Sequence, residues 1–249
     1  MSNAAQRHIK PFVFETETKK KLYFSICEIQ SSMNLREPDA LDLEYTRTMM
    51  GFLLFHPRPS NIGMIGLGGG SLAKFCHRHL PDTHISVVEI NPHVIALRDE
   101  FQVPADSGRF HIIQGDGADF VRCSPVRCDA LLVDGYDSKG LPTRLASQGF
   151  YDGCFQMLAP GGILVVNLLF GHQHYAQKVE RIRRSFNREI LVIDDKKRGN
   201  SIVFASKGRP LASHRAELLC QTGTTAMGAR KPLQGAYAKI LSALKEEFS

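Results

Sequence analysis

The chain has 249 residues, of which 43% are hydrophobic and 22% are charged, close to the averages of folded globular proteins. This length suffices for one α/β domain with short additions, and the composition excludes extended disorder over most of the chain. No apolar run approaches the roughly 20 residues that cross a bilayer, and the polar segment 1–10 lacks the apolar core of a secretion signal. We therefore expect a cytoplasmic protein with no membrane contact.

The formal net charge is +6, and basic residues cluster within segments 181–188 and 196–198. A nucleic-acid surface and ordinary solvated surface are both compatible with such clusters. No aromatic stacking motif is interleaved with them, which favours a solvated helix face and a polar turn. We therefore expect no nucleic-acid partner.

The six cysteines are scattered, and none of them forms a C-x-x-C pair; they are Cys27, Cys76, Cys123, Cys128, Cys154 and Cys220. This pattern is typical of reduced thiols. No cluster of His, Cys, Asp and Glu has the spacing of metal ligands, so we expect no metal.

Along the chain, residues 12–14 and 22–26 have strand character and are separated by a lysine-rich segment. This pattern predicts an N-terminal β-hairpin, and the polar segment 31–40 reads as a connection. Apolar residues at helical spacing then predict a helix over 43–55. Two prolines, Pro57 and Pro59, end it.

From residue 62 onward, predicted strands and helices alternate. The strands are expected at 62–65, 85–89, 110–114, 130–133, 163–168, 190–194 and 201–205, and the helices at 71–79, 92–101, 117–122, 150–158 and 174–186. Nearly continuous apolar strands indicate a mostly parallel sheet covered on both faces. The last two strands have only a turn at 196–200 between them, so they must pair as an antiparallel hairpin.

The tail places five apolar residues on one helical face, namely Tyr237, Ile240, Leu241, Leu244 and Phe248. This pattern predicts a C-terminal helix that packs on the domain or on a second subunit of a homodimer. The chain is thus divided into an N-terminal β-hairpin region (1–40), a catalytic α/β domain (41–207) and a C-terminal helical extension (208–249).

The first strand of the alternation ends in a glycine-rich loop, which is followed at once by a helix. Glycines allow a tight turn and close approach to a ligand, and the helix start offers free N–H donors. Glu89 ends the next strand, where a carboxylate suits ribose hydroxyls, and Asp116 ends the third, where it suits the adenine amino group. A dinucleotide loop would need glycine where Ser71 stands. The predicted nucleoside site comprises Gly66, Gly68, Gly69, Gly70, Ser71, Glu89, Asp116 and Gly117.

The fourth strand ends in two further carboxylates, within Asp134-Gly135-Tyr136-Asp137. The other matching pieces are Tyr45, His56-Pro57, the glycine loop, Glu89-Ile90-Asn91-Pro92, Gly115-Asp116 and Leu158-x-Pro160-Gly161-Gly162. Taken together over about residues 40–207, this set resembles the spermidine synthase (polyamine aminopropyltransferase) family. The resemblance implies a Rossmann-like sheet of the class I methyltransferase type.

The resemblance also implies an activity, the transfer of an aminopropyl group from decarboxylated S-adenosylmethionine to a putrescine-like amine with release of methylthioadenosine. Asp134 is then the base, because the attacking amine must lose a proton. Asp137 is the amine anchor, although its setting also reads as a turn. Tyr45 would hydrogen-bond the amine or its base, and Tyr136 would form the pocket wall.

Two positions depart from the family pattern. Ser71 stands where an acid holds the donor's amino group, and Arg47 stands where an acid binds the acceptor. Arg47 would suit the carboxylate of intact S-adenosylmethionine, so an S-adenosylmethionine-dependent methyltransferase is the first alternative. A non-catalytic nucleoside-binding relative is the second.

Overall fold

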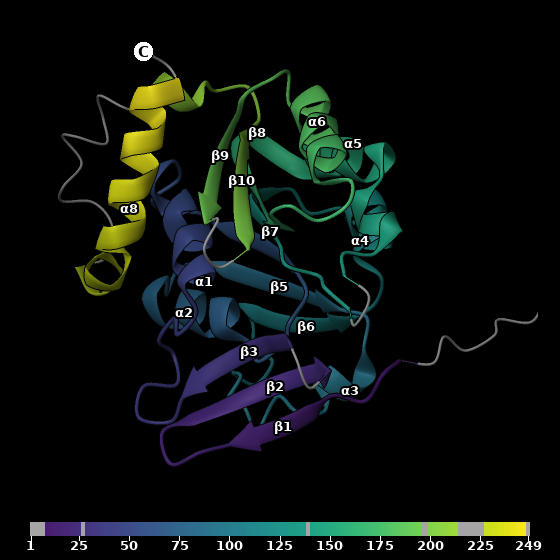
Figure 1. Cartoon of the computed structure of the whole chain (residues 1–249), viewed down its shortest axis with the longest axis vertical. Coiled ribbons are helices and arrows are strands. Elements are labelled where there is room, and N and C mark those ends of the chain that lie inside the picture. Colours follow the sequence, from purple (N-terminus) through teal and green to yellow (C-terminus); the bar gives the residue numbers. More distant parts are fainter. Residues whose placement is uncertain (1–7, 26–27, 138–139, 196–198, 214–226, 248–249) are drawn as a thin grey trace, which may run out of the picture.

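The computed structural model describes residues 8–25, 28–137, 140–195, 199–213 and 227–247. Within these residues, a seven-stranded sheet forms the centre of the molecule, and a smaller three-stranded sheet lies at its lower edge in Figure 1. Helices flank the large sheet on both sides, so the architecture is α/β, as predicted.

The large sheet has the strand order β6-β5-β4-β7-β8-β10-β9. Its strands are β4 (Asn61–Ile65), β5 (His84–Glu89), β6 (Phe110–Gln114), β7 (Cys128–Val133), β8 (Leu158–Leu169), β9 (Ile190–Asp195) and β10 (Asn200–Ser206). Strands β4 to β8 pair in parallel, and β10 pairs antiparallel with both β8 and β9. The predicted parallel sheet with an antiparallel terminal hairpin is therefore confirmed; residues 196–198 of the predicted turn lie outside the described residues.

The helices are α1 (Glu44–Met49), α2 (Ser71–His79), α3 (Pro92–Ile95), α4 (Gly117–Cys123), α5 (Gln148–Met157), α6 (Tyr175–Ser185) and α8 (Met227–Glu247), with short 3-10 turns η1 (Met50–Leu54), η2 (Thr143–Ala146) and η3 (Leu211–Ser213). In Figure 1, α1, α2 and α8 lie on one side of the sheet and α4, α5 and α6 on the other. Successive residues of a strand therefore enter different cores: Leu132 packs in one and Leu131 in the other. Of the described helices, none is long and apolar enough to cross a membrane.

The N-terminal region differs from its prediction. The expected hairpin is present as β1 (Phe12–Glu15) and β2 (Lys19–Ser25), and a further strand, β3 (Glu28–Asn34), extends it into a three-stranded antiparallel sheet. The assignment of residues 31–34 to a connection is wrong, because they pair with β2, with Ser31 opposite Leu22. The residues of β3 are mostly polar, so the strand has no alternating apolar pattern in the sequence, and it forms because it pairs with β2.

Two predicted helices are also shorter than expected. The segment 43–55 divides into α1 and the 3-10 turn η1, and only Pro92–Ile95 of the segment 92–101 is α-helical. The first segment still ends near the expected residue, because Pro57 and Pro59 follow it, whereas the α-helix of the second ends six residues early.

The predicted C-terminal helix is confirmed as α8, which packs on this chain's own sheet and helices. Tyr237, Ile240 and Leu244 are buried in the core that also contains α1. The side chain of Ile240 reaches Gly51 so closely that a Cβ there would lie 2.1 Å from its Cδ1. Phe248 lies outside the described residues.

Contacts of β3 and α2 fix the small sheet against the large one. Lys74 is buried, and its Nζ donates a 2.7 Å hydrogen bond to the carbonyl of Phe101 and lies 3.0 Å from Sδ of Met33. A Cβ at Gly69 would lie 2.7 Å from both Phe101 and Ser31. The small sheet therefore forms a wall behind the glycine loop rather than a separate module.

Candidate active site

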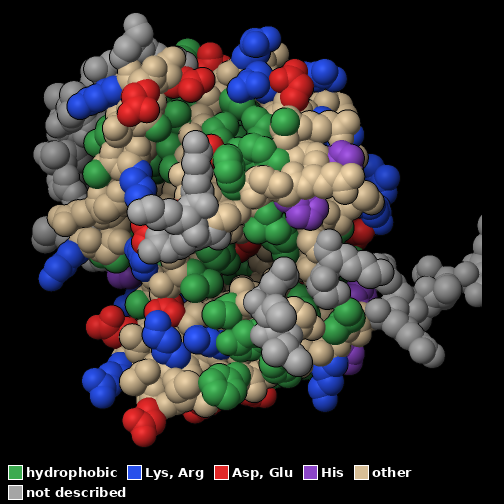
Figure 2. Space-filling model, viewed as in Figure 1, with side chains coloured by type: hydrophobic (Ala, Val, Ile, Leu, Met, Phe, Trp, Pro, Cys, Tyr) green, Lys and Arg blue, Asp and Glu red, His purple; other side chains and the backbone are tan. Residues whose placement is uncertain are grey.

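A cavity of about 1160 Å³ lies at the carboxyl ends of the parallel strands, between the large and small sheets. Figure 2 shows the surface hollowed between the small sheet, at the bottom, and the larger sheet above it. Open α/β sheets bind ligands at this edge, and cavities of about 300–1,000 Å³ already hold drug-sized molecules. There is room here for a nucleoside and a second small molecule.

The sequence-predicted site residues converge on this cavity, which is lined by Tyr45, Arg47, Gly66, Gly68, Ser71, Glu89, Asp116, Gly117, Asp134, Tyr136 and Asp137. Gly69 and Gly70 stand outside this lining. Gly69 packs on Phe101, and Gly70 has φ 70° and packs on Val103. These two glycines shape the loop from behind.

Gly66 brings two strand ends into contact at the base of the cavity. Its φ is +96°, and a Cβ there would lie 2.3 Å from the carbonyl oxygen of Asp134. The Asp134 N–H donates to the carbonyl of Ile65 at 2.9 Å. Only a residue without a side chain permits this approach, so the glycine loop and Asp134 face the same space.

Glu89 is buried at the end of β5, and its carboxylate is held by backbone donors. Oε2 accepts from the Leu67 N–H at 2.9 Å, and Oε1 accepts from the Asn91 N–H at 2.8 Å. Burial raises the pKa of Glu89, and these hydrogen bonds lower it again without cancelling the rise. The carboxylate is thereby fixed beside the glycine loop and retains lone pairs for the cavity.

Asp116 is bound more tightly than the sequence suggests. It caps α4, where Oδ1 accepts from the Ala118 N–H at 2.7 Å, and Oδ2 forms a 2.7 Å ion pair with Arg144. Arg144 also pairs with Asp119 at 2.8 Å. The segment after β7 is thus tied to the adenine side of the predicted pocket.

Asp134 is half-buried and lies between two donors from different elements. Tyr45 Oη donates to Oδ2 at 3.0 Å, and Asn167 Nδ2 donates to Oδ1 at 2.8 Å. Burial raises the pKa of Asp134, and the hydrogen bonds from Asn167 and Tyr45 offset part of this rise. Perturbation by burial within a cavity is typical of groups that exchange protons during catalysis.

Tyr136 and Asp137 follow Asp134 but point to different partners. Tyr136 Oη donates to the backbone carbonyl of Asn167 at 3.0 Å. Asp137 is exposed, and its backbone pairs with Gly140 through hydrogen bonds of 3.0 and 3.1 Å. Asp137 therefore sits in a turn at the rim, with Asp134 at the base of the cavity.

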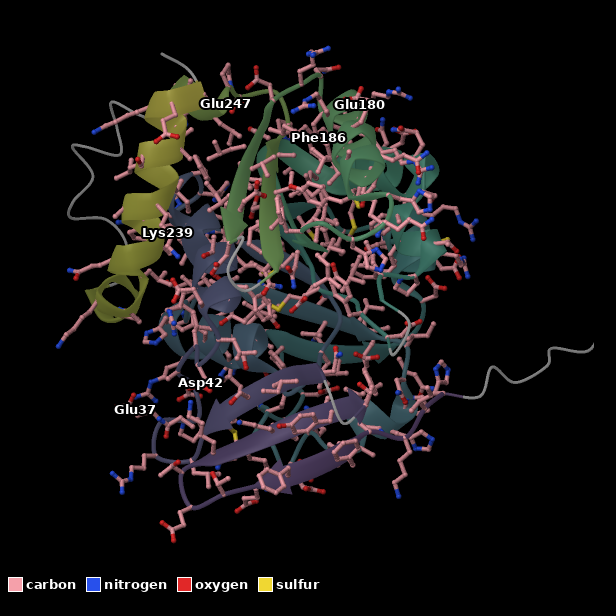
Figure 3. All side chains as sticks on the ribbon, in the orientation of Figure 1. Glu37, Asp42, Glu180, Phe186, Lys239 and Glu247 are labelled. Carbon is pink, nitrogen blue, oxygen red and sulfur yellow. The ribbon has the colours of Figure 1, made fainter. Side chains whose placement is uncertain are left out.

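Arg47 does not extend freely into the cavity, because backbone and side-chain acceptors hold its guanidinium. It donates to the carbonyl of Leu41 and, at 3.0 Å, to Glu44 Oε2. The other Glu44 oxygen pairs at 2.6 Å with Lys239, which extends from α8 toward α1 (Figure 3). Helix α1 therefore does carry a carboxylate, that of Glu44, but each of its two oxygens is already paired with a cation.

Several cavity residues escaped the sequence analysis: Asp42, Glu44, Arg144, Asn167 and Asn200. A polar Asn167 within an apolar strand was a usable signal, because a buried amide requires partners. Asp42, labelled in Figure 3, accepts from Lys19 at 2.8 Å and Ser32 at 2.5 Å, contacts that only the fold reveals. No group of three or more His, Cys, Asp and Glu able to hold a metal ion occurs in the part of the chain that the structure describes.

Comparison with known proteins shows the family to which the chain belongs. The spermine/spermidine synthase domain matches residues 42–192. A polyamine aminopropyltransferase from Chromobacterium violaceum is 39% identical over 192 residues, which cover 77% of this chain and 74% of the relative.

Solved structures share the fold. A probable spermidine synthase from Corynebacterium glutamicum superposes with a TM-score of 0.70 at 19% identity, covering 91% of both chains. Human methyltransferase-like protein 13 in complex with SAH gives a TM-score of 0.62 at 21% identity, covering 80% of this chain and 93% of that one. The sheet is therefore of the class I methyltransferase type, and the chain belongs to the spermine/spermidine synthase family of transferases.

Proposed function

We propose that the enzyme transfers an aminopropyl group from decarboxylated S-adenosylmethionine to a small amine, with Asp134 as the proton acceptor. The observation that carries this proposal is the placement of Asp134. It lies half-buried at the base of the cavity, between Tyr45 and Asn167, and its backbone touches the glycine loop at Gly66. A fixed carboxylate is thus available next to the expected position of the donor.

The reaction needs little covalent chemistry from the protein. The amine nitrogen attacks the propyl carbon bound to the sulfonium, a C–N bond forms, and the C–S bond breaks with its electron pair passing to sulfur. Methylthioadenosine leaves as a neutral thioether, and the proton of the attacking nitrogen passes to Asp134. Glu89 and Asp116 orient the nucleoside, so positioning supplies much of the rate.

The family relationship and the state of Arg47 both favour aminopropyl transfer over methyl transfer. Arg47 was the residue expected to bind the carboxylate of intact S-adenosylmethionine, but Leu41 and Glu44 already hold it. Decarboxylated S-adenosylmethionine lacks this carboxylate, so its binding does not require Arg47. The proposal places the reaction in the cytoplasm, where the free thiols of Cys76, Cys128 and Cys154 stay reduced.

The test is a mass-spectrometric product assay with purified protein, either donor, and a panel of di- and polyamines. We expect methylthioadenosine and an acceptor heavier by one aminopropyl group. Asp134→Asn should reduce turnover by about 10²-fold or more while methylthioadenosine binding survives. Asp82→Asn, in an exposed turn, is the matched control.

Two outcomes would contradict the proposal. S-adenosylhomocysteine with a methylated acceptor would make the protein a methyltransferase. Full turnover in Asp134→Asn would remove Asp134 from the role of base.

A further inference from the structure

Asn167 is a polar side chain near the end of the mostly apolar strand β8, and each of its polar groups toward the cavity has a partner. It is buried, and its Nδ2 donates to Asp134 Oδ1 at 2.8 Å. Its Oδ1 accepts from Asn200 Nδ2 at 3.1 Å, and its backbone carbonyl accepts from Tyr136 at 3.0 Å. Asn167 therefore connects β10 to the carboxylate at the end of β7.

These hydrogen bonds all run the same way, with Asn200 donating to Asn167 and Asn167 donating to Asp134. A side-chain amide has one donor end and one acceptor end, which exchange when the amide rotates by half a turn. The Asp134 carboxylate needs the donor end of Asn167, which turns the oxygen of that amide toward Asn200. Asn200 satisfies this oxygen with its own N–H, so it holds Asn167 in the orientation that serves Asp134.

The ionisation of Asp134 depends on the orientation of Asn167, because few other groups among the described residues stabilise its charge. One donor holds each carboxylate oxygen: Asn167 holds Oδ1 and Tyr45 holds Oδ2. The titratable side chains that face Asp134 within the described residues are the phenols of Tyr45 and Tyr136. The ionised form of Asp134 thus depends on neutral hydrogen-bond donors, and each donor removed makes it harder to ionise.

We propose that Asn200 and Asn167 form an amide relay that positions Asp134 and keeps it ionised, so both are positioning residues of the reaction. The relay rests on the proposed function, since it assigns to Asp134 the role of base. Asn167 acts on Asp134 directly, and Asn200 acts only through Asn167. This order distinguishes the relay from two independent contributions.

The first experiment compares Asn167→Leu, Asn200→Ala and the double variant by the dependence of kcat/KM on pH. Asn167→Leu loses a hydrogen bond to a charged group. The acid limb of its kcat/KM profile should therefore shift to a pH about one unit higher than in the wild type. Asn200→Ala should move it in the same direction by less. The double variant should match Asn167→Leu, because in the relay Asn200 acts on Asp134 through Asn167.

Ser201→Ala is the matched control. Ser201 neighbours Asn200 on β10, is buried, and donates to Asp194 at 2.6 Å, outside the relay. It should lower thermal stability and leave the acid limb in place. An equal limb shift in this control, an unshifted limb in Asn200→Ala, or additive shifts in the double variant would each overturn the relay.

A second measurement does not depend on turnover. Carbon-13 NMR of carboxyl-labelled aspartate follows the titration of Asp134 in the free protein, and its pKa should rise in the same order among the variants. If the wild-type protein transfers no aminopropyl group but this order holds, the proposed function fails and the relay stands. If transfer occurs and the order is absent, the relay alone fails.

Discussion

Lys239 Nζ lies 2.6 Å from Glu44 Oε1, so an ion pair joins the C-terminal helix α8 to a residue that lines the cavity. Glu44 is also paired with Arg47, and two cations therefore neutralise this carboxylate in the lining of the cavity. The C-terminal extension is thus electrostatically part of the candidate active site.

Lys239→Met should release Glu44 to attract a cationic acceptor. We expect the KM for a diamine to fall by about two- to fivefold, the range set by a partly exposed ion pair. Steady-state kinetics over a diamine series measures it, and Lys231→Met, exposed on the same helix, is the control. An unchanged KM would show that Glu44 does not contact the acceptor.

Glu44 also predicts a pH effect on stability. Hydrogen bonds from Lys239 and Arg47 lower the pKa of Glu44 to about 2. Because the folded pKa lies below the unfolded value of 4.5, the stabilisation is present above pH 4.5 and lost as the pH falls toward 2. Urea unfolding of Glu44→Gln and the wild type should differ at pH 6 and converge toward pH 2. A constant difference across this range would refute the depressed pKa.

Glu89→Gln should weaken nucleoside binding. The amide retains one acceptor for the N–H groups of Leu67 and Asn91 and turns its NH₂ toward the other. We expect about 10- to 100-fold weaker binding of methylthioadenosine by calorimetry, as loss of hydrogen bonds to a charged group implies. Glu100→Gln, an exposed acid, should bind normally. Normal binding by Glu89→Gln would move the ribose site elsewhere.

Lys74 should make stability rise with pH in alkaline solution. Burial lowers the pKa of Lys74 from 10.5 to about 8, so between these values the unfolded chain binds more protons than the folded one. Wild-type stability relative to Lys74→Met should therefore increase from pH 8 to pH 10.5, by up to about 1.4 kcal/mol per pH unit. Parallel unfolding curves for the two proteins would mean that Lys74 is not neutralised in the fold.

Gly66→Ala should destabilise the fold, and Gly149→Ala should not. At Gly66 a Cβ would collide with the carbonyl of Asp134, whereas at Gly149 in α5 no atom lies within 4 Å. We expect a loss of about 2–4 kcal/mol for the first variant, because strain and overpacking combine. The second should gain up to about 1 kcal/mol from helix propensity. Chemical denaturation of both variants gives the comparison, and similar stabilities would contradict the close approach.

The central sheet could be predicted because its strands are buried on both faces. Strands such as β7 and β8 are mostly apolar, which is a local signal that needs no partner. The small sheet lacked this signal at β3, where residues such as Gln30 and Ser31 are polar and the strand exists through its pairing with β2.

The residues of the candidate site likewise fall into a group that could be predicted from the sequence and a group that could not. Glu89, Asp116 and Asp134 were predictable because each ends a recognisable strand at one edge of the sheet. Asn200 and Lys239 were not, since they approach the cavity from elements far along the chain. The division into regions 1–40, 41–207 and 208–249 and the homodimer remain predictions.

The chain order of the relay has a consequence for synthesis on the ribosome. The glycine loop, Glu89 and Asp134 are translated early, but Asn200 and Lys239 emerge only after most of the parallel sheet has been made. Domains generally fold as units, and β8, which carries Asn167, pairs with β10 in the same sheet. A chain stalled before β10 would therefore lack the strand that completes the sheet as well as the amide that orients Asn167, so nucleoside binding and an oriented base would be acquired together, late in synthesis.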